Sequence, residues 1–579
     1  MELINKNPFF FYIKMFRKEF LTGLFFLLIT NALDAYYPFI LKDAIDQISS
    51  GQPGENLFYT ALQFFALMST LAATRFLWRT IFGKYHTYSA EDLRDKIFSH
   101  LKTLGPRFFA KNPIGELMSL ITNDVQAVRQ ALGGGLLTLV DGVSIIILVL
   151  PMMIYLNADW TWKTLIFLPA VPFLISKVMK LIYSSFKIQQ DRLSDVAAFS
   201  QELISGIRVV KGFAQEDNRL IKYNIESRKL EDASNKVSKI DALFMPIMEF
   251  GVASGSVILL LLISKTPELE AISIGSIVAF QRFIHKMVWP MSALGFSMSQ
   301  IQKGMASFSR IEKFLKEVTD IPNDGKLQLE EIKTITVENL SFKYPDTDVY
   351  ALKNINFEIK QGETVGIVGP VGSGKTTLIN LIARLHPKTE GEIYYNSLPS
   401  HDFDQLSFYN KVSLVPQEAF LFSDTIEENI SFGLPQVLKQ EYLNSLTNTV
   451  DIYHEVNDLE HQFKSQLGER GVNLSGGQKQ RLTIARSLAM NSDLIILDDS
   501  LSAVDLKTEN KIKSELSKIG YRTKIIVTHR LSSILKADKI IVVCAGQIEA
   551  IGNHESLLQN SSTYKKMAEI QGYLPQELA

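Results

Sequence analysis

The chain has few of the residues that mark several common protein classes. It carries one cysteine, Cys544, among 579 residues, so no intrachain disulfide can form and cysteine alone cannot build a metal site. Its formal net charge of −1 argues against a nucleic-acid-binding protein, because such proteins usually carry a basic excess or stripe. Charged residues make up only 21% of the chain and hydrophobic residues 46%. This length and apolarity predict more than one domain, with one part embedded in a lipid bilayer.

Long hydrophobic runs are crowded into the first 300 residues. Six of them are long enough to cross a hydrocarbon core, which needs about 20 residues of helix. They lie at 20–45, 57–80, 131–156, 160–184, 242–265 and 272–300. Short polar loops join the runs in pairs, whereas the two other connections are long and have helical charge patterns. The sequence therefore predicts an all-α transmembrane domain of six helices over 20–302.

Basic residues set the expected orientation of these spans. Lys6, Lys14, Arg17 and Lys18 precede the first span, while the short loops hold few cations. Because cytoplasmic segments carry the positive excess, we expect the N-terminus, both long connections and the second half in the cytoplasm, with the spans in a cytoplasmic (inner) membrane. Residues 1–19 interleave aromatic and basic residues, which predicts a helix in the membrane interface rather than a cleavable signal.

Each long connection holds a segment, 108–118 in the first and 206–217 in the second, where apolar residues and turn signals interrupt charged helical patterns. Periodicity favours ordinary tips of helix hairpins, and docking into a groove of the second domain is the alternative. After residue 302 a polar linker, 303–330, leads into short β-like runs that alternate with helical patterns. These runs predict an α/β nucleotide domain over 331–579.

Residues 369–377 read Gly-Pro-Val-Gly-Ser-Gly-Lys-Thr-Thr, which fits the phosphate-binding pattern G-x-x-x-x-G-K-[ST]. They lie between a β-like run, 364–368, and an apolar helical pattern, as a nucleotide site requires. The glycines let backbone N–H groups point at the β- and γ-phosphates, the lysine supplies a positive charge, and the first threonine supplies a hydroxyl for Mg²⁺. The predicted nucleotide-binding residues here are Gly369, Gly372, Ser373, Gly374, Lys375, Thr376 and Thr377.

Two further elements indicate the same chemistry. The apolar run 494–497 ends in Asp498, which would place a carboxylate beside Mg²⁺, opposite Thr376. A glycine-rich turn precedes a helical pattern, so its backbone amides and the helix N-terminus suit a second anion. That turn consists of Ser475, Gly476, Gly477 and Gln478. Two phosphate-binding elements in one chain indicate a nucleotide held between two such domains.

On these motifs the whole chain resembles an ATP-binding cassette (ABC) half-transporter of the type I exporter architecture. That fold is an all-α six-helix transmembrane domain followed by an α/β P-loop NTPase domain. The resemblance implies ATP and Mg²⁺ as cofactors, and a dimer in which each ATP lies between one phosphate loop and the other subunit's signature sequence, 474–478. It assigns adenine stacking to Tyr344, Mg²⁺ contact to Gln417, a loop crossing to the opposite subunit to 502–505 with Asp505, and γ-phosphate contact to His529.

One position departs from the family's pattern. Hydrolysing members usually carry glutamate as the general base after the strand acid, and this chain has Asp499 there. The shorter side chain would stand farther from the attacking water, and a misplacement of about 1 Å can cost on the order of 100-fold in rate. This resembles the aspartate-bearing subunit of heterodimeric multidrug-type exporters, whose signature completes the partner's site. The alternative is a slower homodimer in which Asp499 is the base or hydrolysis relies on His529 and Mg²⁺.

Three ionisable residues within the sixth hydrophobic run, Arg282, His285 and Lys286, share one helical face. Ionisable groups at membrane depth face a cavity or a partner rather than lipid. This stripe predicts contact with amphiphilic substrates that carry an acidic group. Structural pairing is the alternative, with Asp34, Asp141 and Glu249 of other spans as counter-ions.

The sequence thus predicts ATP-driven export of an amphiphilic small molecule, drug or lipid by one half of a dimer, with no nucleic-acid partner. A lipid or peptide exporter is the nearest alternative, and a sensor or regulatory ATPase that transports nothing is an alternative of another class. Nucleotide-driven movement of a solute across the membrane would exclude the sensor or regulatory ATPase.

Overall fold

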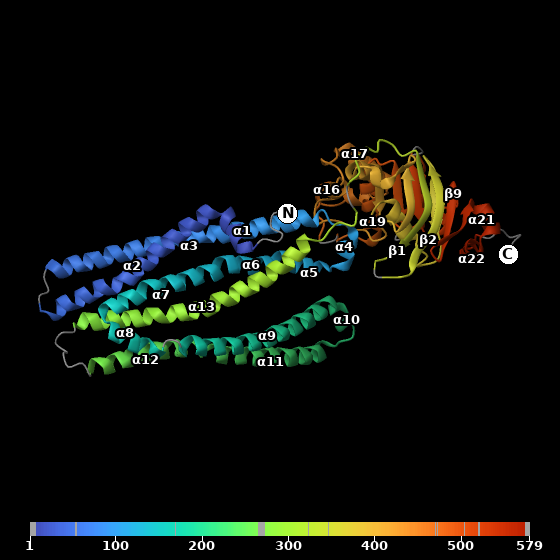
Figure 1. Ribbon diagram of the computed structural model, residues 1–579. Coiled ribbons are helices and arrows are strands. Elements are labelled where there is room, and N and C mark those ends of the chain that lie inside the picture. The colour runs from blue at the N-terminus through green and yellow to red at the C-terminus, as the bar shows by residue number, and fades with distance from the viewer. Residues whose placement is uncertain are drawn as a thin grey trace. The chain divides into compact units, whose positions relative to one another are not determined.

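The computed structural model describes residues 7–51, 55–167, 170–264, 273–321, 324–345, 347–468, 471, 473–502, 504–518 and 522–573. The chain divides into two compact units, one helical and one α/β (Figure 1). The first unit holds the residues up to Lys102 and Pro113–Glu317, and the second holds Thr103–Asn112 and the residues from Val318 onward. The helical unit comes first along the chain, as the sequence predicts.

The first unit consists of long helices. They are α1 (Pro8–Met15), α2 (Arg17–Ser49), α3 (Glu55–Leu101), α5 (Ile114–Ser119), α6 (Val125–Gln130), α7 (Leu136–Leu156), α8 (Ala158–Thr164), α9 (Ala170–Ser205), α10 (Ile207–Gly212), α11 (Glu216–Asp241), α12 (Phe244–Ser264) and α13 (Ile274–Leu315). Single π-helical turns, Leu120–Asp124 and Ala131–Gly135, connect α5 to α6 and α6 to α7. Helix α13 runs beyond residue 302, so the helical unit extends to residue 317.

Four helical stretches among the described residues are long and apolar enough to cross a membrane: Arg17–Ser49, Glu55–Leu101, Ile114–Leu156 and Glu216–Ser264. They contain most of the first, second, third and fifth predicted spans. The fourth predicted span includes residues 168–169, and the loop before the sixth comprises 265–270, all outside the described residues. The sixth span falls in α13, where Arg282 and Lys286 interrupt the apolar run. The number of six spans stays a prediction.

The long helices pack side by side in pairs, α2 along α3, α7 along α13 and α9 along α11 (Figure 1). Phe280, Phe283, Ile284 and Met287 of α13 are buried and belong to one cluster with residues of α7, α8 and α12. Their i, i+3, i+4, i+7 spacing places them on one face of the helix. The neighbouring polar side chains of α13 therefore project from its other faces.

The segment Thr103–Asn112, which contains α4 (Pro106–Lys111), packs with the nucleotide domain as part of the second unit. Gly105 lies so close to Asp320 that a Cβ at residue 105 would come within 2.1 Å of Asp320 Oδ1. Asp320 belongs to the polar linker, and the grouping of residues 103–112 with the second unit favours docking over a free hairpin tip for this part of the first connection. The corresponding helix of the second connection, α10, belongs to the first unit and exposes Val209 and Phe213.

The second unit contains two sheets. The antiparallel sheet has the order β2-β1-β4-β5, with β1 (Thr334–Lys343), β2 (Tyr350–Lys360), β4 (Glu390–Tyr395) and β5 (Leu398–Pro399). The other sheet has the order β10-β9-β3-β8-β7-β6, with β3 (Thr364–Val368), β6 (Val412–Val415), β7 (Leu494–Asp498), β8 (Thr523–Val527), β9 (Lys539–Cys544) and β10 (Gln547–Gly552). All its neighbours pair in parallel except β9 and β10. The carboxyl ends of β3, β8 and β7 therefore meet at one edge, where ligands of such sheets bind.

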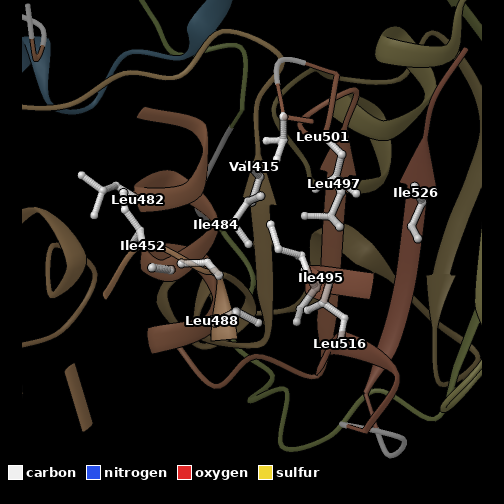
Figure 2. Close-up of a cluster of buried hydrophobic side chains, with 14 of the residues drawn as sticks. Val415, Ile452, Leu482, Ile484, Leu488, Ile495, Leu497, Leu501, Leu516 and Ile526 are labelled. Carbon is white, nitrogen blue, oxygen red and sulfur yellow. The ribbon is translucent and has the colours of Figure 1, made fainter. Parts of the chain in front are cut away.

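The helices of the second unit are α4, α14 (Lys375–Ile382), α15 (Gln405–Lys411), α16 (Ile426–Ile430), α17 (Gln440–Thr449), α18 (Tyr453–Asn457), α19 (Gly476–Ala489), α20 (Leu506–Lys518), α21 (His554–Asn560) and α22 (Ser562–Ile570). Alternate residues of β7 enter different cores: Ile495 and Leu497 belong to one cluster, and Leu494 and Ile496 to the other. Figure 2 shows the first cluster, where side chains of α19 lie beside those of β6 and β7. This packing fixes the helix that begins at the predicted signature sequence.

Candidate functional site

The loop between β3 and α14 has the conformation that phosphate binding requires. Gly369, Gly372 and Gly374 have φ angles of 154°, 79° and 101°. A Cβ at residue 369 would come within 1.9 Å of the Val543 carbonyl oxygen, so only glycine fits there. These backbone angles turn the loop around the N-terminus of α14, where N–H groups lack helical partners.

Lys375, the first residue of α14, turns its ammonium group back into this loop. Its Nζ donates hydrogen bonds to the carbonyl oxygens of Gly369 at 2.9 Å and Pro370 at 2.8 Å. Burial lowers the pKa of Lys375, and the charges of Asp498 and Asp499 oppose that shift. A partly buried cation held by neutral carbonyl groups in a glycine-rich loop fits an anionic ligand such as a phosphate.

Two side chains whose oxygen atoms could bind a metal ion face each other beside this loop. Thr376 Oγ1 donates a hydrogen bond to Asp498 Oδ1 at 3.4 Å, and Asp498 is buried at the end of β7. Burial raises the pKa of the Asp498 carboxyl. A buried carboxylate beside a hydroxyl is a donor set that suits a hard cation such as Mg²⁺. The structure therefore brings together two of the three residues that are predicted to contact the metal, and Gln417 is the third.

Asp499 and His529, the two predicted catalytic residues, form a pair. His529 Nδ1 lies 3.0 Å from Asp499 Oδ1 and 3.1 Å from its Oδ2. Asp499 has a φ of 44°, and its N–H donates to the Val527 carbonyl oxygen at 2.8 Å. This contact joins the end of β7 to the end of β8. It turns the carboxylate towards the imidazole.

A residue far along the chain, which the sequence does not single out, holds the loop after β8. Gln571 Nε2 donates to the His529 carbonyl oxygen at 2.7 Å, and the Leu531 N–H donates to Gln571 Oε1 at 2.8 Å. Gln571 follows α22 and belongs to no motif. Only the folded structure reveals that this glutamine bridges two backbone positions beside the imidazole.

The predicted second anion site is the N-terminus of α19. Ser475 caps the helix: its Oγ accepts from the Gln478 N–H, and Gln478 Oε1 accepts from the Ser475 N–H at 2.8 Å. Gln478 Nε2 also donates to Glu455 Oε2 at 2.5 Å, a partner that the motif does not predict. Ser475 and Gly476 are exposed, and within the described part of the chain no hydrogen bond joins them to the phosphate loop.

The three other residues predicted to bind the nucleotide differ in their exposure and in their hydrogen bonds. Tyr344 is partly exposed, its hydroxyl lies 2.9 Å from Thr377 Oγ1, and it lines a cavity of about 440 Å³. Gln417 follows β6 and is exposed, and its side chain makes no hydrogen bond within the described residues. Asp505 caps α20, where Oδ1 accepts from the Lys507 and Thr508 N–H groups, and these bonds lower the pKa of its carboxyl.

The three candidate substrate residues of α13 differ in their contacts. Lys286 Nζ forms an ion pair with Asp34 of α2, so structural pairing explains this cation. Arg282 and His285 are exposed. Asp141 is one of the other two proposed counter-ions. It forms no ion pair among the described residues, and its carboxylate accepts a hydrogen bond from Asn31 Nδ2 at 2.9 Å. The third, Glu249, lines a cavity with His285 and Lys286.

Comparisons with known proteins agree with this geometry. Residues 20–291 match the family described as "ABC transporter transmembrane region", and residues 352–502 match the family described as "ABC transporter". The chain is 35% identical to the "Multidrug resistance-like ATP-binding protein MdlA" of Buchnera aphidicola subsp. Schizaphis graminum, with 98% of each chain covered. It is 33% identical to the "Probable multidrug resistance ABC transporter ATP-binding/permease protein YheI" of Bacillus subtilis, with 98% of this chain and 97% of the relative covered.

A solved structure has the same fold. The chain superimposes on the structure of a bacterial Atm1-family ABC exporter that has ATP bound, and the TM-score is 0.80. The two sequences are 23% identical, and the match covers 96% of this chain and 99% of the other. At this identity the likeness concerns the fold alone. Together with the family matches, it confirms the predicted order of a helical transmembrane region and an α/β nucleotide domain.

Proposed function

The chain belongs to the ABC transporter family, as an exporter half-transporter with one membrane region and one ABC ATPase domain, and we propose that it exports amphiphilic small molecules as one half of a dimer. It is an integral multi-pass membrane protein with an ABC-type ATPase coupled to transport. Multidrug-type export is supported by relatives whose names refer to multidrug resistance. The basic residues before the first predicted span, which include Lys14 and Lys18, support placing the N-terminus and the ATPase domain in the cytoplasm.

ATP binding is assigned to the phosphate loop and the residues beside it. Lys375 and the loop N–H groups would hold the phosphates, Thr376 and Asp498 would hold Mg²⁺, and the Tyr344 ring would stack on the adenine. Bound Mg²⁺ would neutralise negative charge on the β- and γ-phosphates. The single observation that carries this assignment is the partly buried Lys375 ammonium group, which lies in a loop of glycines beside the Thr376 and Asp498 pair.

The signature sequence is assigned to the partner's ATP. Ser475 and Gly476 expose the N-terminus of α19 and make no hydrogen bond to this chain's own phosphate loop among the described residues. An exposed helix N-terminus suits an anion brought by a second subunit. Each ATP would then be held between two chains, and binding of both would close the dimer.

We assign slow hydrolysis to the chain's own site. The Asp499 carboxylate directs both oxygens at His529 Nδ1, so it is engaged in orienting the imidazole. Aspartate is also one methylene shorter than the glutamate that the family resemblance implies as the base of hydrolysing members. His529, held by this contact, would keep its other ring nitrogen for the γ-phosphate. A partner with a glutamate at this position would then supply the faster site, which favours a heterodimer over a homodimer.

The export function is tested with inside-out membrane vesicles that contain the full chain and any partner that co-purifies with it. ATP-dependent accumulation of a fluorescent amphiphile is expected, and the Lys375→Ala variant should abolish it. Hydrolysis without movement of any solute would favour a regulatory ATPase. Movement of a fluorescent phospholipid alone would favour the lipid exporter.

A further inference from the structure

The first unit contains a cavity of about 840 Å³ that the ATPase chemistry does not use. Its walls come from α2, α7, α12 and α13. This volume lies in the range of sites that enclose drug-sized ligands. Four ionisable residues line it: Asp34, Glu249, His285 and Lys286.

The cation in this cavity already has a counter-ion. Lys286 Nζ pairs with Asp34 Oδ2 and lies 4.4 Å from the centre of the Tyr37 ring. Arg75 approaches the other Asp34 oxygen at 3.7 Å, although Arg75 does not line the cavity. Lys286 is therefore occupied by Asp34 and Tyr37, and an incoming acidic group would have to displace this pairing.

Glu249 is in the opposite situation. It lies on α12, within a helical stretch long and apolar enough to cross a membrane. Within the described part of the chain its carboxylate forms no ion pair and no hydrogen bond. A carboxylate at membrane depth is costly without a partner, and such residues usually mark a substrate or ion path. The group that Glu249 lacks is a cation.

The other walls suit the apolar part of an amphiphile. Trp289, Phe244, Met245 and Met248 line the cavity together with aliphatic residues. The Trp289 side chain is 52% exposed in this chain, so its ring is accessible. Indole faces attract organic cations, and methionine side chains adapt to ligands of different shape.

We propose that this cavity is the substrate site and that Glu249 selects amphiphiles with a delocalised or ammonium-type positive charge over those with an acidic group. The proposal rests on the export function above and names its substrate class. It departs from the prediction from the α13 stripe, because Lys286 is paired with Asp34 and Arg282 does not line the cavity, while Glu249 has no ion-pair partner in the described part of the chain.

The test uses two probes of nearly equal size and opposite charge, tetraphenylphosphonium and tetraphenylborate. Their binding to the purified full-length protein in detergent is measured by equilibrium dialysis without ATP. We expect saturable binding of the cation at least ~10-fold tighter than that of the anion. Glu249→Gln should remove about 10-fold or more of the cation affinity, whereas Glu231→Gln, on exposed α11, should leave it unchanged.

Any of four results would overturn the proposal. These are equal binding of both probes, preference for the anion, absence of saturable cation binding, and unchanged cation affinity in Glu249→Gln. ATP binding is measured on the same samples, so that a misfolded variant is recognised. If Glu249→Gln fails to fold, Glu249→Asp is used, and it should keep the charge preference. ATP-driven uptake in vesicles is measured separately. Binding as expected without uptake would refute the export function and leave the site proposal supported.

Discussion

At the residue scale, the site depends on side chains that follow neighbouring parallel strands. Asp498 ends β7 and Asp499 comes directly after it, His529 follows β8, and Lys375 and Thr376 follow β3. Because β8 lies between β3 and β7, all five side chains reach one edge of the sheet. The motifs predict which residues meet there. They do not predict that Asp499 contacts His529, because that contact depends on the positive φ of Asp499 and on the pairing of β7 with β8.

The charge on Asp498 should cost stability when no cation is bound. Burial raises the pKa of this carboxyl, so the folded domain favours the protonated form, and the cost appears as the pH rises above the ordinary aspartate pKa of about 4. Asp498→Asn should therefore stabilise the nucleotide-free protein at pH 7 by on the order of 1 kcal/mol, or about 2–4 °C in the first thermal transition.

Differential scanning fluorimetry at several pH values checks this prediction. The gain from Asp498→Asn should shrink as the pH falls, because the aspartate then becomes protonated too. The same variant should lose Mg²⁺-dependent ATP hydrolysis. A variant that is no more stable than the unmodified protein at pH 7 would show that the carboxylate is not strained by burial.

Gln571 provides a second prediction at this scale. Its amide bridges the His529 carbonyl group and the Leu531 N–H, so Gln571→Ala should loosen the loop that carries the imidazole. In the Asp499→Glu background, where the site should turn over, we expect hydrolysis to fall on the order of 10-fold with ATP affinity unchanged. Gln559→Ala, on exposed α21, is the matched control. Equal rates in both variants would mean that the loop holds without Gln571.

At the element scale, α19 joins the hydrophobic core to the signature sequence. Leu482, Ile484 and Leu488 pack into the cluster beside β6 and β7 (Figure 2), and Ser475 caps the other end of the helix. Ser475→Ala should remove the cap at a cost of about 1 kcal/mol and lower the ATPase rate of the dimer about 10-fold, because the same serine would face the partner's ATP.

The control for Ser475→Ala is Asn553→Ala, which removes the side-chain cap of α21. It should cost similar stability, measured by thermal unfolding, and leave the ATPase rate of the dimer unchanged. If both variants lose the same activity, the effect of Ser475→Ala comes from reduced stability alone, and the role of the signature in the partner's site is not supported.

Elements with strong local signals are predictable from the sequence, and long-range pairings are not. The β-like run at 364–368 and the apolar run at 494–497 predict strands, and the structure places β3 and β7 there. The docking of α4 depends on contacts such as Gly105 with Asp320, which leave no periodic pattern. In the same way, the sequence offers three acids as partners for the α13 cations, and only the packing of α2 against α13 selects Asp34.

At the scale of the whole molecule, each chain carries one phosphate loop and one signature sequence, which no hydrogen bond joins in the described part of the chain. In the proposed arrangement, two chains together build the two ATP sites of the dimer. The membrane cavity and the ATPase site belong to different units, so substrate choice and hydrolysis rate should respond to different substitutions. Glu249→Gln should change substrate choice, and Asp499→Glu should change the hydrolysis rate.

The proposed slow hydrolysis at Asp499 is tested most directly by the ATPase activity of the purified chain in lipid, alone and as Asp499→Glu. Proteins that co-purify from the native membrane are identified in the same preparation. The account predicts activity near background for the unmodified chain, a rise of about 10-fold or more with glutamate, and a second half-transporter in the eluate. Vigorous hydrolysis by the unmodified chain without a partner would contradict it and make Asp499 a working base in a homodimer.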